Sequence, residues 1–185
     1  GAGMALDGQV WNGGNFVAGE FGHNPLPWMT KEEFPGPKCW CGLHGCLELW
    51  ISGTGFEDDY QRSNPQMNDR MKGHEIMALY ERGDERAVTV FNAYKSRLAR
   101  AIAHVVNLID PVCVVLGGGM SNVDALYTGL NEDVQRYVFG NEADTPILKN
   151  THGDSSGVRG AAWLWPAGEE NEAAYPDVKK AGGMV

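Results

Sequence analysis

The sequence has no concentrated positive charge. Its 185 residues carry a formal net charge of -9, and the nearest approach to a basic cluster is the pair Lys179–Lys180. A nucleic-acid surface needs clustered Lys and Arg to displace counterions from phosphate. No stretch is long and apolar enough to cross a bilayer, and there is no charged start followed by an apolar run and a cleavage site. We therefore expect a cytoplasmic protein with neither nucleic acid nor membrane as a partner.

An initiating methionine is also missing, and no internal repeat is present. Residues 1–6 resemble the second half of a glycine loop followed by a strand, so we expect a piece of a longer chain. With 43% hydrophobic residues the chain can form a sizeable core. We assign residues 1–165 to that unit. Residues 166–185 are acidic and then glycine-rich, have little to bury, and are expected to be poorly ordered.

Cysteine is scarce, and three of the four cysteines lie within eight residues. Cys39, Cys41 and Cys46 follow His23 in a loop with neither a helical nor a strand period. A Cys-x-Cys pair is poorly placed to form a disulfide with itself, whereas three thiolates and one imidazole are a common tetrahedral zinc set. The alternatives are small core residues with one polar histidine, or His44 as the fourth ligand. We favour structural Zn²⁺ on His23 and the three cysteines.

The predicted zinc loop spans residues 18–48 and contains four prolines, so it requires a constraint such as metal ligation. Glu20 and Glu48 flank the ligands. A neutral zinc-bound imidazole keeps one N–H donor, and ionised carboxylates accept paired hydrogen bonds, a combination suited to sugar hydroxyls. We predict that Glu20, His23 and Glu48 bind a sugar. Either acid could instead be solvated or support a zinc ligand, and the tryptophans nearby could stack on a sugar or pack: Trp28, Trp40 and Trp50.

Periodicity predicts an α/β fold in which strands and helices alternate. Asp84 is expected to cap a long helix ending near Leu108, and Asp69 to be a helix cap. The run 111–116 is predicted to be a strand buried on both faces, with Cys113 as a packed thiol. The apolar face of the long helix is predicted to contain Val88, Phe91, Leu98, Ile102 and Val105. The other predicted elements are a hairpin over 4–11, a strand over 146–149 and several helices. The helices are predicted over 46–51, in a short segment ending near residue 60, and over 76–81, 123–138 and 155–165.

Gly117, Gly118 and Gly119 follow the predicted strand 111–116. In open α/β sheets ligands bind beyond the carboxyl ends of strands, and bare backbone before a helix lets a nucleotide approach closely. The three glycines could equally form a simple turn. The sequence has no Gly-x-x-x-x-Gly-Lys-Ser/Thr, so it is not a P-loop protein.

Five segments together resemble the ROK family of sugar kinases and sugar-responsive repressors. They are Ala18 to Pro27, Cys39 to Glu48, Ile51 to Phe56, Val115 to Asn122 and His152 to Ala162. The similarity covers nearly everything from residue 1 to 165 and is greatest to bacterial fructokinases or mannofructokinases. It implies the carboxy-terminal lobe of an actin-like, ribonuclease-H-like kinase with a zinc-bound loop.

The resemblance implies that MgATP donates its γ-phosphoryl to a hexose, fructose being favoured. His23, Cys39, Cys41 and Cys46 would bind zinc; Glu20, His23 and Glu48 would hold the sugar. Gly1 and Gly3 would be the remnant of a phosphate loop, and Gly117 to Gly119 would line the adenosine side. A homodimer is also implied.

Two family motifs are absent from the sequence: the Asp-x-Gly-Gly-Thr phosphate loop and the Asn-Asp-Ala-Asn segment near the aspartate that deprotonates the attacking hydroxyl. Because phosphoryl transfer needs both reactants positioned and a base aimed at the nucleophile, we expect these residues alone to be inactive and to require an amino-terminal lobe. The alternatives are the sugar-sensing domain of a ROK transcriptional regulator and a zinc-stabilised interaction module.

Overall fold

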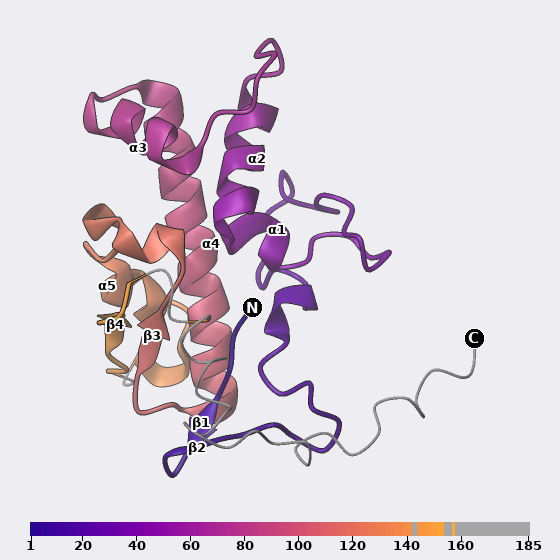
Figure 1. Cartoon of the computed structure of the whole chain (residues 1–185), viewed down its shortest axis with the longest axis vertical. Coiled ribbons are helices and arrows are strands. Elements are labelled where there is room, and N and C mark those ends of the chain that lie inside the picture. The colour runs from indigo at the N-terminus through magenta and orange to yellow at the C-terminus, as the bar shows by residue number, and fades with distance from the viewer. Residues whose placement is uncertain (142–143, 154–156, 158–185) are drawn as a thin grey trace, which may run out of the picture.

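The computed structural model describes residues 1–141, 144–153 and 157 (Figure 1). The helix predicted over 155–165 and the tail 166–185 therefore lie outside the described residues, apart from position 157. Within the described residues, no helix is long and apolar enough to cross a membrane. The regular elements follow one another as β1 (Ala5–Leu6), β2 (Gln9–Val10), η1 (Phe21–His23), α1 (Glu48–Ile51), α2 (Gly53–Ser63), α3 (Gly73–Glu81), α4 (Glu85–Ile109), β3 (Val114–Leu116), η2 (Gly119–Asn122), η3 (Asp124–Leu126), α5 (Leu130–Gln135), η4 (Phe139–Asn141) and β4 (Ile147–Lys149).

The amino-terminal hairpin forms as predicted. Strands β1 and β2 pair antiparallel, with Ala5 opposite Val10 and Leu6 opposite Gln9. Asp7 and Gly8 connect them with φ values of 51° and 74°. Two consecutive left-handed residues match the twist of a tight hairpin, and an Asp-Gly pair adopts them readily.

The second sheet consists of β3 and β4, which are parallel, with Val114 opposite Ile147 and Leu116 opposite Lys149. Strand β3 occupies only the last three residues of the predicted range 111–116, and the prediction that it is buried on both faces is wrong. Val115 is 56% exposed and Cys113 is exposed rather than packed. Only one face of this two-stranded sheet packs on the main core, and an unbroken β-branched run does not distinguish one buried face from two.

Helix α4 is the longest element and runs through the centre of the described structure (Figure 1). Asp84 begins it, because its Oδ1 accepts a hydrogen bond of 2.9 Å from the backbone N–H of Ala87. The left-handed Asp110, with φ of 47°, ends it immediately before Pro111. Both boundaries agree with the predicted helix from Asp84 to about Leu108 within one or two residues.

The predicted apolar face of α4 is only partly correct. Phe91, Leu98 and Ile102 are buried, whereas Val88 and Val105 are intermediate in exposure. The buried stripe is wider than predicted because α4 packs against α2 and α3 on one side and α5 on another. Its further buried hydrophobic members are Ala87, Val90, Tyr94, Ala99, Ala101, Ala103 and Val106.

Two other local predictions are wrong. Asp69 does not cap a helix: α3 begins after Lys72, whose backbone N–H donates to Glu75 Oε2 at 2.7 Å. The single helix predicted over 123–138 is divided into η3 and α5. Gly129 lies at the division with φ of 69°, a left-handed conformation that a right-handed α-helix does not contain.

The main core lies where α2, α3, α4 and α5 meet. Its most completely buried side chains include Phe56, Ile76, Phe91, Leu126 and Leu130. A smaller core contains Leu26 and Leu47, which pack with Trp50 of α1 and Ala101 of α4. Burial of apolar surface therefore attaches the predicted zinc loop to α4 at Leu26 and at Leu47. Trp50 was predicted either to stack on a sugar or to pack; it is 5% exposed and therefore packs.

A buried ion network adds a second attachment of the loop to α4. Glu33 Oε1 accepts from Arg97 Nε at 2.8 Å and from Arg100 Nη2 at 2.7 Å. Glu33 Oε2 accepts from Arg100 Nη1 at 2.8 Å and from the backbone N–H of Thr30 at 3.0 Å. Arg100 Nη1 also donates to the carbonyl oxygen of Trp28 at 2.7 Å. These bonds satisfy the carboxylate and the guanidinium groups inside the protein.

The network makes stability depend on pH. Burial raises the pKa of Glu33, but hydrogen bonds from Arg100, Thr30 and Arg97 outweigh it and lower the pKa from 4.5 to about 2. A carboxyl with a depressed folded-state pKa stabilises the protein above its unfolded pKa and ceases to do so as pH falls through its folded value. We expect the difference in unfolding free energy between wild type and Glu33→Gln to stay constant above about pH 5. It should then shrink by up to about 3 kcal/mol as pH falls from 4.5 towards 2. Urea titrations of both proteins across this range test it, and a difference independent of pH would contradict it.

Candidate metal and sugar site

The loop over residues 18–48 is irregular, as predicted, but it is internally hydrogen-bonded. Isolated bridges pair Pro25 with Cys46 and Lys38 with His44. At Gly36, φ is 79° and an added Cβ would lie only 2.5 Å from the Cα of Gly45. Glycine is required there because two backbone segments touch. The loop thus folds back on itself and brings its distant ends together.

The four predicted metal ligands converge. One ligand atom from each of His23, Cys39, Cys41 and Cys46 lies within 4.8 Å of all the others. The Cys39 Sγ to His23 Nδ1 distance is 3.6 Å, and the Cys41 Sγ to Cys46 Sγ distance is also 3.6 Å. His23 is the last residue of η1, and Cys39 and Cys41 lie in the turn between Lys38 and His44. Cys46 lies two residues before the start of α1. The exposed His44 is not a member of this cluster.

The donor set fits a tetrahedral zinc ion. With Zn–S bonds of about 2.3 Å and a Zn–N bond of about 2.1 Å, a tetrahedron has S–S edges of about 3.8 Å and S–N edges of about 3.6 Å. Two of the separations, Cys39 Sγ to His23 Nδ1 and Cys41 Sγ to Cys46 Sγ, are 3.6 Å and lie close to these values, and the others are no longer than 4.8 Å. Soft thiolates with one imidazole favour zinc over magnesium or calcium. The residues therefore suit the expected structural Zn²⁺, which remains a proposal below.

The thiols of Cys41 and Cys46 differ in pKa. Burial, followed by the neighbouring thiols of Cys41 and Cys39, raises the pKa of Cys46 to about 12. The backbone N–H of Leu43 is the main reason why the pKa of Cys41 lies below its usual value. A buried thiol of this kind retains its proton at neutral pH unless a divalent cation replaces it, so metal binding would release protons.

Glu48 lies at the edge of the cluster, at the first residue of α1. Its Oε1 is 3.6 Å from His23 Nδ1 and 3.3 Å from Cys39 Sγ. The same oxygen accepts a hydrogen bond of 3.0 Å from Nε1 of Trp40. The side chains of His23 and Glu48 are each 30% exposed. The arrangement offers a carboxylate and an imidazole together at a surface that a polar ligand can reach.

Glu20 is exposed and directly precedes η1. An added Cβ on Gly22 of η1 would lie 3.6 Å from Glu48 Cβ, so the segments carrying the two acids are side by side. The amino-terminal glycines are close as well: a Cβ on Gly19 would lie 2.9 Å from the Cα of Gly3. The residues predicted to contact sugar and phosphate thus belong to adjoining segments.

Gly117 to Gly119 follow β3, at its carboxyl end, as predicted. A Cβ added to any of the three would meet no atom within 4 Å, which leaves their backbone open to a ligand. The turn that follows is fixed by Ser121, whose hydroxyl donates to the carbonyl of Gly118 at 2.6 Å. Met120 packs near Gly53, the first residue of α2, since a Cβ there would lie 3.7 Å from Met120 Cγ.

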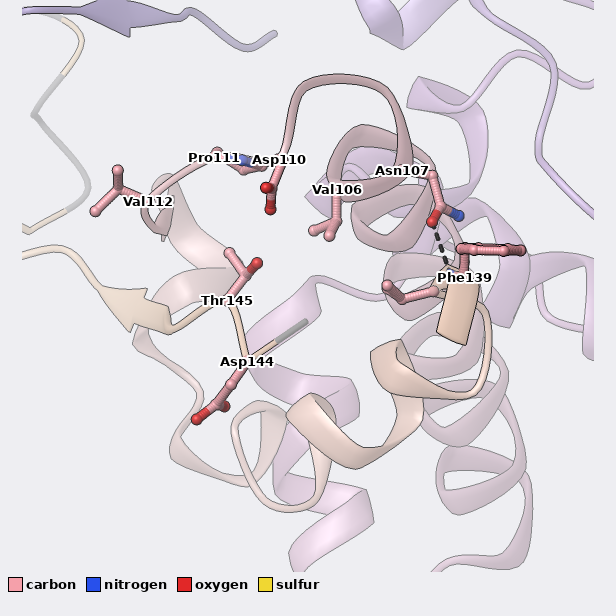
Figure 2. Close-up of a pocket in the computed structure, with 9 residues that line it drawn as sticks. Val106, Asn107, Asp110, Pro111, Val112, Phe139, Asp144 and Thr145 are labelled. Carbon is pink, nitrogen blue, oxygen red and sulfur yellow. Dashed lines mark hydrogen bonds between the residues drawn. The ribbon is translucent and has the colours of Figure 1, made fainter. Parts of the chain in front are cut away.

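A cavity of about 630 Å³ lies at the carboxyl end of α4 (Figure 2). Figure 2 shows its lining residues coming from that helix end and from the segments around Phe139 and Thr145. Phe139 is held there by a hydrogen bond of 2.9 Å from its backbone N–H to Asn107 Oδ1. None of the metal cluster, Glu48 or the two glycine segments lines this cavity.

Fold and cluster together define an α/β protein whose loop gathers one histidine and three cysteines, and comparison with known proteins shows its family. The model of the ROK family matches residues 1–168. N-acetyl-D-glucosamine kinase of Escherichia coli strain K12 / DH10B is 38% identical over 168 residues, covering 89% of this chain and 54% of that protein. The chain belongs to the ROK family, and it spans about half the length of the curated relatives it matches.

Solved structures agree. ROK hexokinase from Thermus thermophilus is 31% identical, with a TM-score of 0.72 over 86% of this chain and 51% of that chain. A ROK family transcriptional regulator, a homologue of the E. coli MLC protein, is 25% identical, with a TM-score of 0.64 over 80% of this chain and 38% of that chain. The family assignment and its actin-like sugar-kinase fold are thereby confirmed.

Two features of the site were not predicted. Trp40 was expected only to stack on a sugar or to pack, and its bond to Glu48 was not predicted. Glu33 was not predicted as a functional residue, because a Glu32–Glu33 pair in a loop resembles solvated surface charge. The only sequence signal for Glu33 is the pair Arg97 and Arg100 within the otherwise apolar stripe of α4.

Proposed function

We propose that this chain is the sugar-binding lobe of an ATP-dependent hexose kinase. The observation that carries the proposal is the junction of His23 and Glu48 beside the four-residue metal cluster, in a chain of the ROK family. Glu48 would accept hydrogen bonds from sugar hydroxyls, His23 would donate one from the ring nitrogen that does not bind metal, and Glu20 would approach from the adjoining segment.

His23, Cys39, Cys41 and Cys46 would hold the zinc ion. When bound, the ion supplies a structural crosslink that fixes the loop and contributes directly to folding. The residues then act as positioned groups: the loop holds His23 against Glu48 and excludes alternative rotamers of both. Precise placement of a hydroxyl acceptor and donor is what sugar recognition in a kinase needs.

MgATP would bind at the glycine segments. Gly117 to Gly119 would line the adenosine side, and Gly1 and Gly3 would contribute to the phosphate side, supported by the open backbone at all five positions. The catalytic base is not among the residues assigned here, because the family segment that carries it is missing from the sequence. We therefore propose that the 185 residues alone do not turn over substrate, and that a second lobe and a homodimer belong to the working kinase.

The least constrained part of the proposal is which hexose the site binds. Resemblance in the sequence favours fructose, whereas the E. coli relative is named for N-acetyl-D-glucosamine. One hydroxyl or acetamide is discriminated by contacts spread over a whole pocket. Fructose, glucose, mannose and N-acetyl-D-glucosamine are therefore the panel for the test.

The test is hexose binding by the zinc-loaded chain, measured by calorimetry and by thermal stabilisation. Glu48→Gln should weaken binding of the preferred hexose by about 10- to 100-fold, the effect of losing a hydrogen bond to a charged group. Glu32→Gln, at an exposed glutamate in the same loop, is the matched control and should bind as wild type does. If no sugar of the panel binds or stabilises the wild-type chain, the proposal is wrong.

A regulator is the second candidate, favoured by the similarity to the ROK transcriptional regulator. A regulator of this kind would bind sugar as the kinase does, but it would not use ATP. Binding of a non-hydrolysable ATP analogue that is lost when Gly118 is replaced by a bulky residue supports the kinase. Hexose binding without any nucleotide binding supports the regulator.

A further inference from the structure

Trp40 has an unusual environment for so large an apolar side chain. It lies between the ligands Cys39 and Cys41, and it is 82% exposed. Its single polar atom is nevertheless engaged, since Nε1 donates to Glu48 Oε1 at 3.0 Å. Its ring meets the His23 ring edge-to-face, with centroids 4.9 Å apart and planes at 86°. One exposed indole thus contacts both residues that are brought together at the edge of the cluster.

The Glu48 carboxylate needs a hydrogen-bond donor that fixes its orientation. Its other close donor is the Cys39 thiol, 3.3 Å from the same oxygen. A thiol is a weak hydrogen-bond donor, whereas the indole N–H is a full donor and lies closer, at 3.0 Å. The indole N–H is therefore the group that holds Oε1 in place. Glutamate has three rotatable side-chain bonds, and a carboxylate without a fixed donor would lose rotamer entropy each time a ligand bound.

We propose that Trp40 is a positioning residue of the sugar site, acting through Glu48. Its indole N–H anchors one carboxylate oxygen and leaves the second free for a sugar hydroxyl, while its ring sets the face of the His23 imidazole. Cys39 and Cys41 flank it on both sides, so a metal ion held by these cysteines would fix the backbone of Trp40, and the indole would hold the carboxylate in turn. This inference rests on the proposed hexose-binding function.

The anchoring bond can be tested without sugar. In ¹⁵N–¹H spectra of the metal-loaded chain, the indole resonance of Trp40 is the one missing from Trp40→Phe. In Glu48→Ala that resonance should shift and its proton should exchange several-fold faster with water, because the acceptor is gone. The resonance of Trp28, a half-exposed tryptophan of the same loop, should be unchanged. A Trp40 resonance that is insensitive to Glu48→Ala overturns the proposal.

The consequence for binding is tested with a double-mutant cycle. Trp40→Phe should retain the same zinc content as wild type and as the control Trp28→Phe, yet bind the preferred hexose about tenfold more weakly. In a Glu48→Gln background the same substitution should change affinity less than about twofold, because the group it positions is missing. Equal effects in both backgrounds, or an unchanged affinity of Trp40→Phe, overturn the proposal.

The outcomes separate this inference from the proposed function. If wild type binds hexose and Glu48→Gln binds it more weakly while Trp40→Phe equals wild type, the role of Trp40 is wrong and the sugar site stands. If wild type binds no hexose, the sugar site is wrong, and the positioning role falls with it.

Discussion

Cys46→Ser should abolish stoichiometric zinc binding, reducing the content from about one ion per chain towards zero. Cys46 is 1% exposed, and its Sγ is 3.6 Å from that of Cys41. Serine offers a hard hydroxyl with a much higher pKa, which is a poor zinc ligand. Because binding to a structural zinc site contributes about 10–16 kcal/mol to folding in small domains, the remaining three ligands should not keep the loop closed.

The matched control is Cys113→Ser, at the exposed cysteine beside β3 and outside the cluster. It should keep the full zinc content. Elemental analysis after gel filtration measures the metal, and limited proteolysis reports whether residues 18–48 become accessible. Full zinc content in Cys46→Ser, or none in unchelated wild type, would refute the predicted site.

Glu33→Gln should be the most destabilising single substitution outside the metal cluster and the hydrophobic cores. It leaves Arg97 and Arg100 buried, at 8% and 3% exposure, without the carboxylate that both contact. Removing one partner of a buried ion pair costs about 3–5 kcal/mol, because an uncompensated charge remains in the interior. Arg97 would keep its contact with Asp59 and its position 4.4 Å over the Trp50 ring, so the lower half of that range is expected.

Urea unfolding of the zinc-loaded chain at pH 7 measures this effect, with Glu32→Gln as the neighbouring control expected to lie within about 0.5 kcal/mol of wild type. Retention of metal by Glu33→Gln at reduced stability would show that the two attachments of the loop act separately. A loss below about 1 kcal/mol would mean that water replaces the carboxylate.

Cys46 and Glu33 belong to two separate attachments of the loop over residues 18–48. The metal cluster joins its start and end, and the Glu33 network joins its middle to α4. A proline-rich segment of this length forms few regular hydrogen bonds of its own, which do little to compensate its ordering entropy. Together the attachments explain how such a segment can hold His23 and Glu48 in register.

Features that depend on nearby residues were predicted from the sequence. Asp84 predicted the start of α4, and the predicted end near Leu108 is within two residues of the observed one, where Asp110 is left-handed. The alternation of apolar residues predicted the hairpin, and the structure shows that Asp7-Gly8 forms its turn. The convergence of His23 with the three cysteines was also predicted, because Cys and His at ligand spacing in an aperiodic loop have few other uses. In each case the physical cause acts over a short stretch of chain.

The errors occurred where distant segments decide the outcome. Cys113 and the run 111–116 appeared fully buried, but which faces are covered depends on the strands and helices that lie alongside. Val88 and Val105 fit a helical period, yet the buried width of α4 depends on the positions of α2, α3 and α5. Gly129 divides a helix that periodicity alone would have continued.

The sequence by itself determined the family, the long helix and which four Cys and His side chains would come together, since local spacing and side-chain chemistry specify all three. Only the tertiary structure decided that Glu33 is buried between arginines 64 and 67 residues away, and that the Trp40 indole contacts the Glu48 carboxylate. Neither pairing has a sequence period or a fixed spacing. Both exist because the folded loop brings donors and acceptors from separate segments within hydrogen-bond distance, and that is a property of three-dimensional packing.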